Sequence, residues 1–222
     1  EILMVIASYY LALRARAEAP RMMLAYASIP HQCVDIPMKE WPAKKEAGDI
    51  CHFGQLPSLK LADGTLISQS GSITRYVAKI AKLYPEDPVA AAEADMIFEL
   101  SQEMGGINPI LNRIPMDQPL WKEKYEEYFA SLPRWMGAAE KLLGDKDFFG
   151  GPAPHYGDFG LFHICDNTLT VDPRSLDSYP AIIAWVDRMK AFPAIQKYMA
   201  ERPGPSTPNW GIPGTFIMSK KA

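Results

Sequence analysis

The stretch SLKLADGTLISQS at residues 58–70 decides the fold class of this chain. Asp63-Gly64 lies between two short apolar runs at residues 59–61 and 65–67. An Asp-Gly pair between such runs is typical of a tight β-hairpin. A helix is predicted directly after the hairpin, at residues 70–81. The stretch therefore predicts two antiparallel strands that lead into a helix.

The predicted helix at residues 70–81 has an apolar face and a polar start. Ile73, Val77 and Ile80 recur at helical spacing and are expected to be buried together. Ser70 is expected to be the N-cap, because a serine hydroxyl can accept a hydrogen bond from a free backbone N–H of the first turn.

The chain before the hairpin predicts two more strands, each followed by a helix. Residues 2–9 form a short continuous apolar run, which is typical of a strand buried on both faces. Ile29-Pro30 is expected to end the first helix, because a proline cannot continue it. The resulting order is β-α-β-α-β-β-α, an α/β arrangement with a mixed sheet. The predicted elements lie at residues 2–9, 14–28, 32–36, 39–47, 58–62, 65–67 and 70–81.

The pattern changes after the connector Tyr84-Pro85-Glu86-Asp87-Pro88. No strand-like run of comparable strength follows it, so we place a domain boundary there, with domains at residues 1–83 and 84–222. The second domain is predicted to be all-helical, and the Pro- and Gly-rich tail from Pro203 is predicted to wrap its surface. Gly105-Gly106 and Pro109 are expected to bend or end its first helix. That helix carries an apolar stripe of Ile97, Leu100, Met104, Ile107 and Leu111, and further helices are predicted at residues 120–143, 159–169, 182–189 and 195–199.

The composition excludes several classes of protein. The chain has 222 residues, 48% of them hydrophobic, and 23 basic against 26 acidic side chains, which gives a net charge of −3. This balance predicts a folded chain and offers no basic surface for a nucleic acid. The apolar runs are shorter than the roughly 20 residues of a membrane helix, so we expect no membrane partner.

The cysteines and the first residue indicate where in the cell the protein is expected to be. Three widely spaced cysteines with no metal-ligand spacing indicate a reducing compartment and no metal. Glu1 stands where a secretory leader would have basic residues, so nothing marks the chain for export, although a leader removed earlier would leave no trace. The reducing compartment indicated by the cysteines therefore predicts a cytoplasmic protein.

Three positions could hold a ligand. Tyr9-Tyr10 ends the first strand, and ligands of open α/β sheets bind at the carboxyl ends of strands; a purely packing role is the alternative. In the loop 53–57, a cis bond before Pro57 would free the backbone of Leu56 for a peptide-like ligand, although most X-Pro bonds are trans. Gln69-Ser70 begins a helix whose free N–H groups could hold a carboxylate; an ordinary structural cap is the alternative.

Four motifs follow one another along the chain: residues 10–18, the pair Trp41 and Lys45, residues 53–57, and residues 67–70. In this order and spacing they together resemble the tyrosine-type glutathione transferases, with the sigma, pi and mu classes nearest in pattern. The resemblance covers the whole chain. It implies a thioredoxin-like amino-terminal domain, an all-helical carboxyl-terminal domain, and glutathione as co-substrate.

The resemblance also implies a role for each matching residue. Tyr10 would donate its hydroxyl hydrogen to the glutathione sulfur, and Arg16 would support it electrostatically. Only one of Tyr9 and Tyr10 should reach the sulfur, because successive strand side chains point to opposite faces. Counting back from Arg16 favours Tyr10; Ser8 is a weaker rival. The other implied glutathione contacts are Trp41, Lys45 and Gln55 to the glycyl end, Leu56 beside Pro57 to the cysteinyl unit, and Gln69 and Ser70 to the γ-glutamyl end.

A homodimer is a further implication of the resemblance. Asp95, Glu99 and Glu103 recur every four residues, and Glu103 would reach the glutathione of the partner subunit, although family members usually have aspartate there. The alternative for this acidic row is a solvated helix face. Phe53 aligns with an aromatic key that some classes insert into the neighbouring subunit, or it covers its own loop.

The second substrate is expected to be a small apolar electrophile bound between the domains. The implied pocket residues are Leu11, Ala12, Met104, Ile107, Leu111 and Trp210, with Phe216 as a second possible lid. Conjugation for detoxification is the leading activity, followed by hydroperoxide reduction and by isomerisation of the prostaglandin D synthase kind. A non-catalytic ligand carrier like the lens crystallins of this family is the other alternative. Retention of Tyr10, Arg16, Gln55, Gln69 and Ser70 argues against the carrier.

One departure from the family pattern concerns folding. His155-Tyr156-Gly157-Asp158 stands where the family has a Ser/Thr-x-x-Asp capping box. Histidine is a poorer N-cap than serine or threonine. Asp158 is expected to be structural and to hold the start of a buried helix.

Overall fold

The computed structural model describes residues 6–11, 13–107, 110, 114–115 and 117–202. Its sheet has four strands in the order β2-β1-β3-β4. They are β1 (Ile6–Leu11), β2 (His31–Ile36), β3 (Ser58–Lys60) and β4 (Leu66–Ser68). β1 pairs parallel to β2 and antiparallel to β3, and β3 pairs antiparallel to β4. The predicted mixed sheet is therefore confirmed.

The β3–β4 hairpin forms where the Asp-Gly pair predicts it. The backbone N–H of Leu61 donates to the Thr65 carbonyl at 2.8 Å, and the N–H of Thr65 donates to Asp63 Oδ1 at 2.8 Å. Gly64 has φ +89°, a conformation that a residue without Cβ adopts at little cost. The turn sets the register in which Leu59 faces Ile67, and Leu59 is fully buried.

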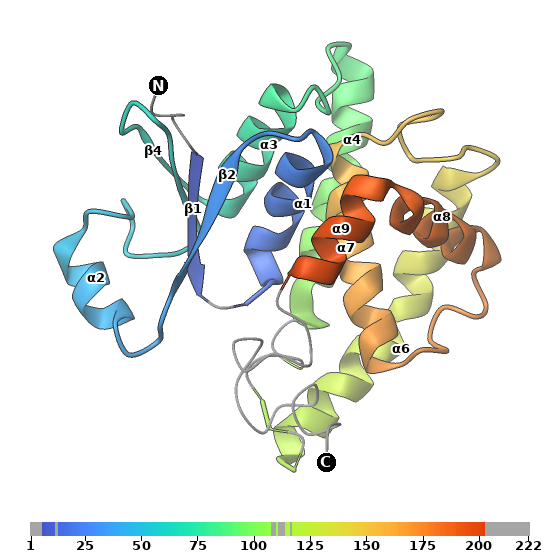
Figure 1. Ribbon diagram of the computed structural model, residues 1–222. Coiled ribbons are helices and arrows are strands. Elements are labelled where there is room, and N and C mark those ends of the chain that lie inside the picture. The colour runs from blue at the N-terminus through green and yellow to red at the C-terminus, as the bar shows by residue number, and fades with distance from the viewer. Residues whose placement is uncertain (1–5, 12, 108–109, 111–113, 116, 203–222) are drawn as a thin grey trace.

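Three helices accompany the sheet: α1 (Glu18–Tyr26), α2 (Trp41–Ala47) and α3 (Ser70–Ile80). Figure 1 shows α1 and α3 on the side of the sheet that faces the helical half, and α2 on the other side. A 3-10 turn, η1 (Ala15–Ala17), precedes α1, so the α-helix is shorter than predicted. The first strand continues to Leu11, two residues beyond its predicted end.

Two details of α3 differ from the prediction. Gln69, not Ser70, is the N-cap residue, and no side chain caps the helix. Ile73 and Val77 are buried as expected, but Ile80 is 36% exposed because it lies in the last turn. The exposed N-terminus of α3 thus keeps backbone N–H groups without a side-chain partner, which bears on the site described below.

The remaining described helices form the second half of the chain. Asp87 caps α4 by accepting from the backbone N–H groups of Val89 and Ala90. The Gly105-Gly106 pair ends α4 as predicted, because the chain tightens into a 3-10 turn there. These elements are α4 (Pro88–Glu103), η2 (Met104–Gly106), α6 (Pro119–Leu143), α7 (Tyr156–Val171), α8 (Pro180–Ala191) and α9 (Pro193–Glu201).

Helix α7 lies at the centre of the helical half, and nearly all of its side chains are buried. His155 and Asp158 form a complete capping box at its start, so the histidine performs the role for which it was expected to be poor. Asp158 also accepts from the backbone N–H of Phe149 at 2.9 Å and from Trp185 Nε1 at 2.9 Å. The structural role predicted for Asp158 is confirmed.

One apolar core connects the two halves of the chain. It contains Met22 and Leu59 from the sheet side together with Phe98, Phe162 and Trp185 from the helices. Residues 81–87 connect α3 to α4. None of the described helices is both long and apolar enough to cross a membrane. The three cysteines are free thiols, of which Cys33 is exposed.

Candidate functional site

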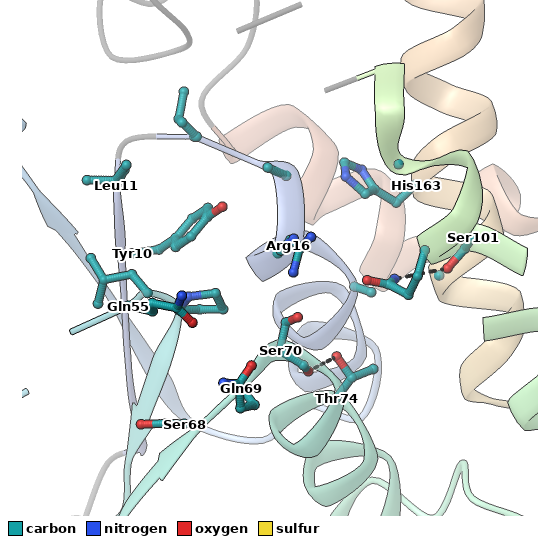
Figure 2. Close-up of a pocket in the computed structure, with 18 of the residues that line it drawn as sticks. Tyr10, Leu11, Arg16, Gln55, Ser68, Gln69, Ser70, Thr74, Ser101 and His163 are labelled. Carbon is teal, nitrogen blue, oxygen red and sulfur yellow. Dashed lines mark hydrogen bonds between the residues drawn. The ribbon is translucent and has the colours of Figure 1, made fainter. Parts of the chain in front are cut away.

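A cavity of about 610 Å³ opens where the carboxyl end of β1 meets the helical half. Its walls come from the segment after β1, the loop before β3, the start of α3, the α4–η2 junction and the middle of α7. Figure 2 shows Tyr10, Gln55 and Gln69 on one side of this cavity, and Ser101 and His163 on the other. Elements far apart in the sequence therefore build one binding site.

The end of β1 brings one tyrosine to the cavity. Tyr10 lines the wall and is 4% exposed, whereas Tyr9 is half-buried and is not part of the wall. Ser8 is buried and does not line it either. The alternation of strand side chains separates Tyr9 from Tyr10, whereas Ser8 is on the same face as Tyr10 but two residues further from the end of β1 that meets the cavity. The catalytic role of Tyr10 stays a prediction.

The two arginines after β1 lie in different surroundings. Arg16 is exposed on the cavity wall and makes no ion pair with another described residue. Arg14 is buried, with Nη1 3.5 Å from Asp166 Oδ2. Burial, reinforced by the charge of Arg202, lowers the pKa of Arg14 to about 10. Arg16 is therefore the arginine that a bound anion can meet.

The loop before β3 provides one face of the cavity. Gln55, Leu56 and Pro57 line it, and the Leu56–Pro57 bond is cis. Trp41, at the start of α2, also lines it. Lys45 does not line it; its Cε lies 2.8 Å from the place that a Cβ on Gly54 would take, so its side chain packs against the loop.

The start of α3 faces the cavity with Gln69 and Ser70. Gln69 has φ +73° and ψ 120°, a strained conformation for a residue with a side chain. The first backbone N–H groups of α3 have no side-chain cap. Because these N–H groups and the helix dipole favour negative charge, this end of the cavity suits a carboxylate.

The acidic row of α4 lies on a partly solvated face and is also paired within the chain, since the Glu99 and Glu103 side chains are more than half exposed. Asp95 Oδ1 accepts from Arg75 Nε at 3.2 Å, and Glu99 binds the same guanidinium. Glu103 accepts from Arg134 Nη2 at 2.5 Å and from Trp135 Nε1 at 3.1 Å. Glu103 does not line the cavity of its own chain; the neighbouring Gln102 does.

The expected electrophile residues are only partly on the wall. Leu11 lines the cavity. Met104 and Ile107 do not: both are fully buried in the core, because the 3-10 turn after α4 directs them inward. That expectation was wrong for these two residues. Ala12, Leu111, Trp210 and Phe216 lie outside the described residues.

Sequence reasoning missed the wall formed by the α4–η2 junction and α7. Ser101, Gln102 and the glycines of η2 form one part of it. On α7, Gly160 allows close contact with α4, since a Cβ there would lie 2.8 Å from Ser101 Oγ. His163 and Ile164 complete this part of the wall. A histidine inside an apolar helix gives no pattern that marks it as a cavity residue.

No metal centre is found in the part of the chain that the structure describes, because no three His, Cys, Asp or Glu side chains are grouped to hold an ion.

A sheet of this order, joined to a helical half with a tyrosine-lined cavity between them, defines the glutathione transferase class, and comparison with known proteins agrees. The model of the glutathione S-transferase N-terminal domain matches residues 15–80, and that of the C-terminal domain matches residues 112–202. Hematopoietic prostaglandin D synthase of Gallus gallus is 31% identical over 196 residues, covering 87% of this chain and 94% of that protein.

Two further relatives agree. Glutathione S-transferase P 1 of Bufo bufo is 27% identical and covers 86% of this chain and 90% of that protein. The structure of a pi-class glutathione S-transferase from Onchocerca volvulus superposes with a TM-score of 0.78 at 27% identity, covering 90% of this chain and 94% of that one. This chain belongs to the glutathione S-transferase family. The resemblance stated from the sequence is confirmed, and glutathione is the co-substrate of that family.

Proposed function

We propose that this chain converts the thiol of bound glutathione into a thiolate that attacks small apolar electrophiles, a detoxifying conjugation. The observation that carries the proposal is the buried Tyr10 in the same cavity as the uncapped N-terminus of α3. The cavity thus offers a hydroxyl donor for a sulfur at one point and an anion site at another.

The activation rests on the charge state of sulfur. A thiol with a pKa of about 8.5 is only a few per cent thiolate at neutral pH. A hydroxyl that donates to the sulfur favours the charged form and so lowers the pKa of the thiol. A shift of about two units makes most of the bound glutathione nucleophilic, which is a gain of roughly 10- to 30-fold in thiolate. Positioning in the cavity supplies the rest of the acceleration.

The tripeptide is oriented by its two charged ends. The α3 N-terminus takes the γ-glutamyl carboxylate, with Gln69 and Ser70 beside it. The backbone of Leu56, next to Pro57, pairs with the cysteinyl unit. Trp41 and Gln55 contact the glycyl end; Lys45 reaches it by leaving Gly54. Arg16 supports the negative charge on the sulfur and on Tyr10.

A pair of tyrosine variants tests the proposal. Tyr10→Phe should lose most of the conjugation activity with 1-chloro-2,4-dinitrobenzene and most of the thiolate absorbance of bound glutathione. Tyr9→Phe is the matched control, since its side chain is not on the wall, and it should keep both. Loss in Tyr9→Phe with retention in Tyr10→Phe would overturn the assignment. Wild-type protein that does not bind immobilised glutathione would refute the function itself.

A second candidate is a glutathione-dependent isomerase of the prostaglandin D synthase kind. The supporting observation is the 31% identity to the hematopoietic prostaglandin D synthase of Gallus gallus. Incubation with glutathione and prostaglandin H2 should then yield prostaglandin D2 in a Tyr10-dependent way. A product mixture equal to that of the uncatalysed breakdown would exclude this activity.

We also propose a cytoplasmic homodimer whose subunits divide into domains at residues 1–83 and 84–222. Phe53 is 64% exposed and lies at the cavity wall, so a partner subunit would find this ring accessible. For Glu103 to reach the glutathione of the partner subunit, its carboxylate must exchange Arg134 and Trp135 for that ligand. Light scattering should give a dimer for the wild type and a larger monomer fraction for Phe53→Ser.

A further inference from the structure

His163 is a buried imidazole that the proposed chemistry does not use. It lies in the middle of α7, is 4% exposed, and forms part of the cavity wall. Figure 2 shows its ring across the cavity from Tyr10, near Ser101 and on the side opposite to Gln55 and Gln69. It therefore lies away from the proposed glutathione contacts, where a second substrate has to fit.

One contact of the ring determines where its proton is. The amide nitrogen Nδ2 of Asn167 lies 3.4 Å from His163 Nε2. An amide nitrogen only donates, so Nε2 is the acceptor and the proton of the neutral ring is on Nδ1. The ring is neutral at pH 7, since burial lowers the pKa of His163 to about 4, although the Glu18 carboxylate acts in the opposite direction.

The N–H at Nδ1 has no hydrogen-bond partner among the described residues. A buried donor without a partner costs stability, and such groups are rare in folded proteins. The unpaired N–H of His163 is therefore a place where a polar ligand atom would be stabilised. Nδ1 is itself buried, and the terminal torsion of a histidine ring has a broad energy well, so binding requires a rotation of the ring that turns Nδ1 toward the cavity.

We propose that His163 donates a hydrogen bond from Nδ1 to the carbonyl oxygen of an α,β-unsaturated aldehyde or ketone, so that enals and enones are preferred second substrates. This inference rests on the proposed function, since it requires a glutathione thiolate in the same cavity. It adds the class of electrophile, which an apolar wall alone does not select.

The reaction balances without any further reactant. The thiolate donates an electron pair to the β-carbon and forms the new S–C bond. The C=C π pair moves to form the C=C bond of an enolate, and the carbonyl π pair moves onto oxygen. A proton from solvent then adds to the α-carbon, and the carbonyl re-forms. The net result is the addition of glutathione across the double bond, with no leaving group and no redox change.

The benefit of a neutral donor at this place is largest in the transition state. The substrate oxygen gains negative charge only as the S–C bond forms, so a fixed N–H stabilises the transition state more than the bound substrate. The histidine keeps its proton throughout. Its effect should therefore appear mainly in kcat.

The test compares two aromatic electrophiles of similar size. In trans-4-phenyl-3-buten-2-one, charge builds up on a carbonyl oxygen; in benzyl chloride, it leaves with chloride. His163→Phe removes the donor and keeps an aromatic ring. His163→Asn places an amide near the former Nδ1, and His163→Gln places one near the former Nε2. All four proteins are measured with saturating glutathione.

We expect His163→Phe to lose on the order of 10-fold more kcat/KM with the enone than with benzyl chloride, a conservative figure for the removal of one donor to a developing oxyanion. His163→Asn should recover most of the loss with the enone, and His163→Gln should not. Equal losses with both electrophiles, or rescue by Gln instead of Asn, would overturn the inference. So would a wild-type enzyme that conjugates benzyl chloride but not the enone.

Two further measurements separate this inference from the proposed function. The thiolate absorbance of bound glutathione should be retained in His163→Asn; a wild type that forms no thiolate would refute the proposed function rather than the role of His163. Long-range ¹H–¹⁵N NMR spectra of histidine-labelled wild-type protein should show the neutral tautomer with its proton on Nδ1. The opposite tautomer would overturn the inference.

Discussion

Arg202 Nη1 lies 2.5 Å from Glu18 Oε1, although 184 residues separate the two in the sequence. The other terminal nitrogen of the guanidinium, Nη2, lies 2.5 Å from Asp166 Oδ2. All three side chains are at least nine-tenths buried. One arginine at the end of α9 therefore neutralises carboxylates from both halves of the chain.

Arg202→Met should destabilise the protein strongly. Removal of one partner leaves the buried Glu18 and Asp166 without their shared cation, which typically costs about 3–5 kcal/mol. Urea unfolding followed by fluorescence measures the change. Arg174→Met is the matched control, because Arg174 pairs with Asp177 on the surface, and it should change the free energy of unfolding by less than about 1 kcal/mol. Equal effects of the two substitutions would contradict the buried network.

The buried imidazole makes stability depend on pH. Burial lowers the pKa of His163 from 6.5 to about 4 in the folded state. Between these values the unfolded chain binds a proton that the folded chain does not bind, so stability falls as the pH falls through this window. The contribution lost from about pH 6.5 to 4 is about 3 kcal/mol. As the pH falls from about 6.5 to 4, the free energy of unfolding should decrease by about 3 kcal/mol more in the wild type than in His163→Phe; parallel curves would show that His163 does not titrate there.

The strained backbone of Gln69 predicts that this residue lowers the stability of the protein while its side chain strengthens the binding of glutathione. Its φ of +73° is costly for a residue with a Cβ and easy for glycine. Gln69→Gly and Gln69→Ala should both raise the KM for glutathione by about 10-fold, a loss of ~1.4 kcal/mol that fits one hydrogen bond. Only Gln69→Gly should raise the melting temperature, by an amount that corresponds to about 1 kcal/mol. Equal stability of the two variants would show that the conformation is not strained.

Replacement of two helical glycines by alanine should change the free energy of unfolding in opposite directions. A Cβ on Gly157 would lie 2.5 Å from the carbonyl oxygen of Ala94, so Gly157→Ala forces α7 away from α4 and should cost about 1–3 kcal/mol. A Cβ on Gly137, inside α6, would meet nothing within 4 Å. Gly137→Ala should stabilise by up to about 1 kcal/mol through helix propensity. Thermal unfolding of the two variants gives the signs directly.

The elements that local sequence determines were predictable, and the contacts between distant elements were not. The hairpin follows from Asp63-Gly64 and its neighbours, and α6 follows from its regular apolar spacing. The same spacing could not tell whether Met104 and Ile107 face the core or the cavity, because both surroundings are apolar. That decision depends on how the 3-10 turn after α4 packs against the other helices.

In the candidate site, too, the features set by local sequence were predictable and the contacts between distant elements were not. The alternation along β1 separates Tyr9 from Tyr10 without any knowledge of the fold. The burial of Arg14 against Asp166, and the place of His163 on the cavity wall, depend on the docking of α7 beside α1. No short stretch of sequence contains that information. Glu103 was predicted to act between subunits, and its bonds to α6 were not foreseen for the same reason.

The cavity walls extend from Tyr10 to Ile164, so the ligand site is complete only when both halves of the chain are folded against each other. A ligand that binds only such a complete state stabilises the whole molecule in proportion to the logarithm of its concentration. Glutathione is then a folding ligand as well as a reactant. A cell in which electrophiles have consumed its glutathione would leave this enzyme more open to proteases, and its amount would fall at the time of greatest demand.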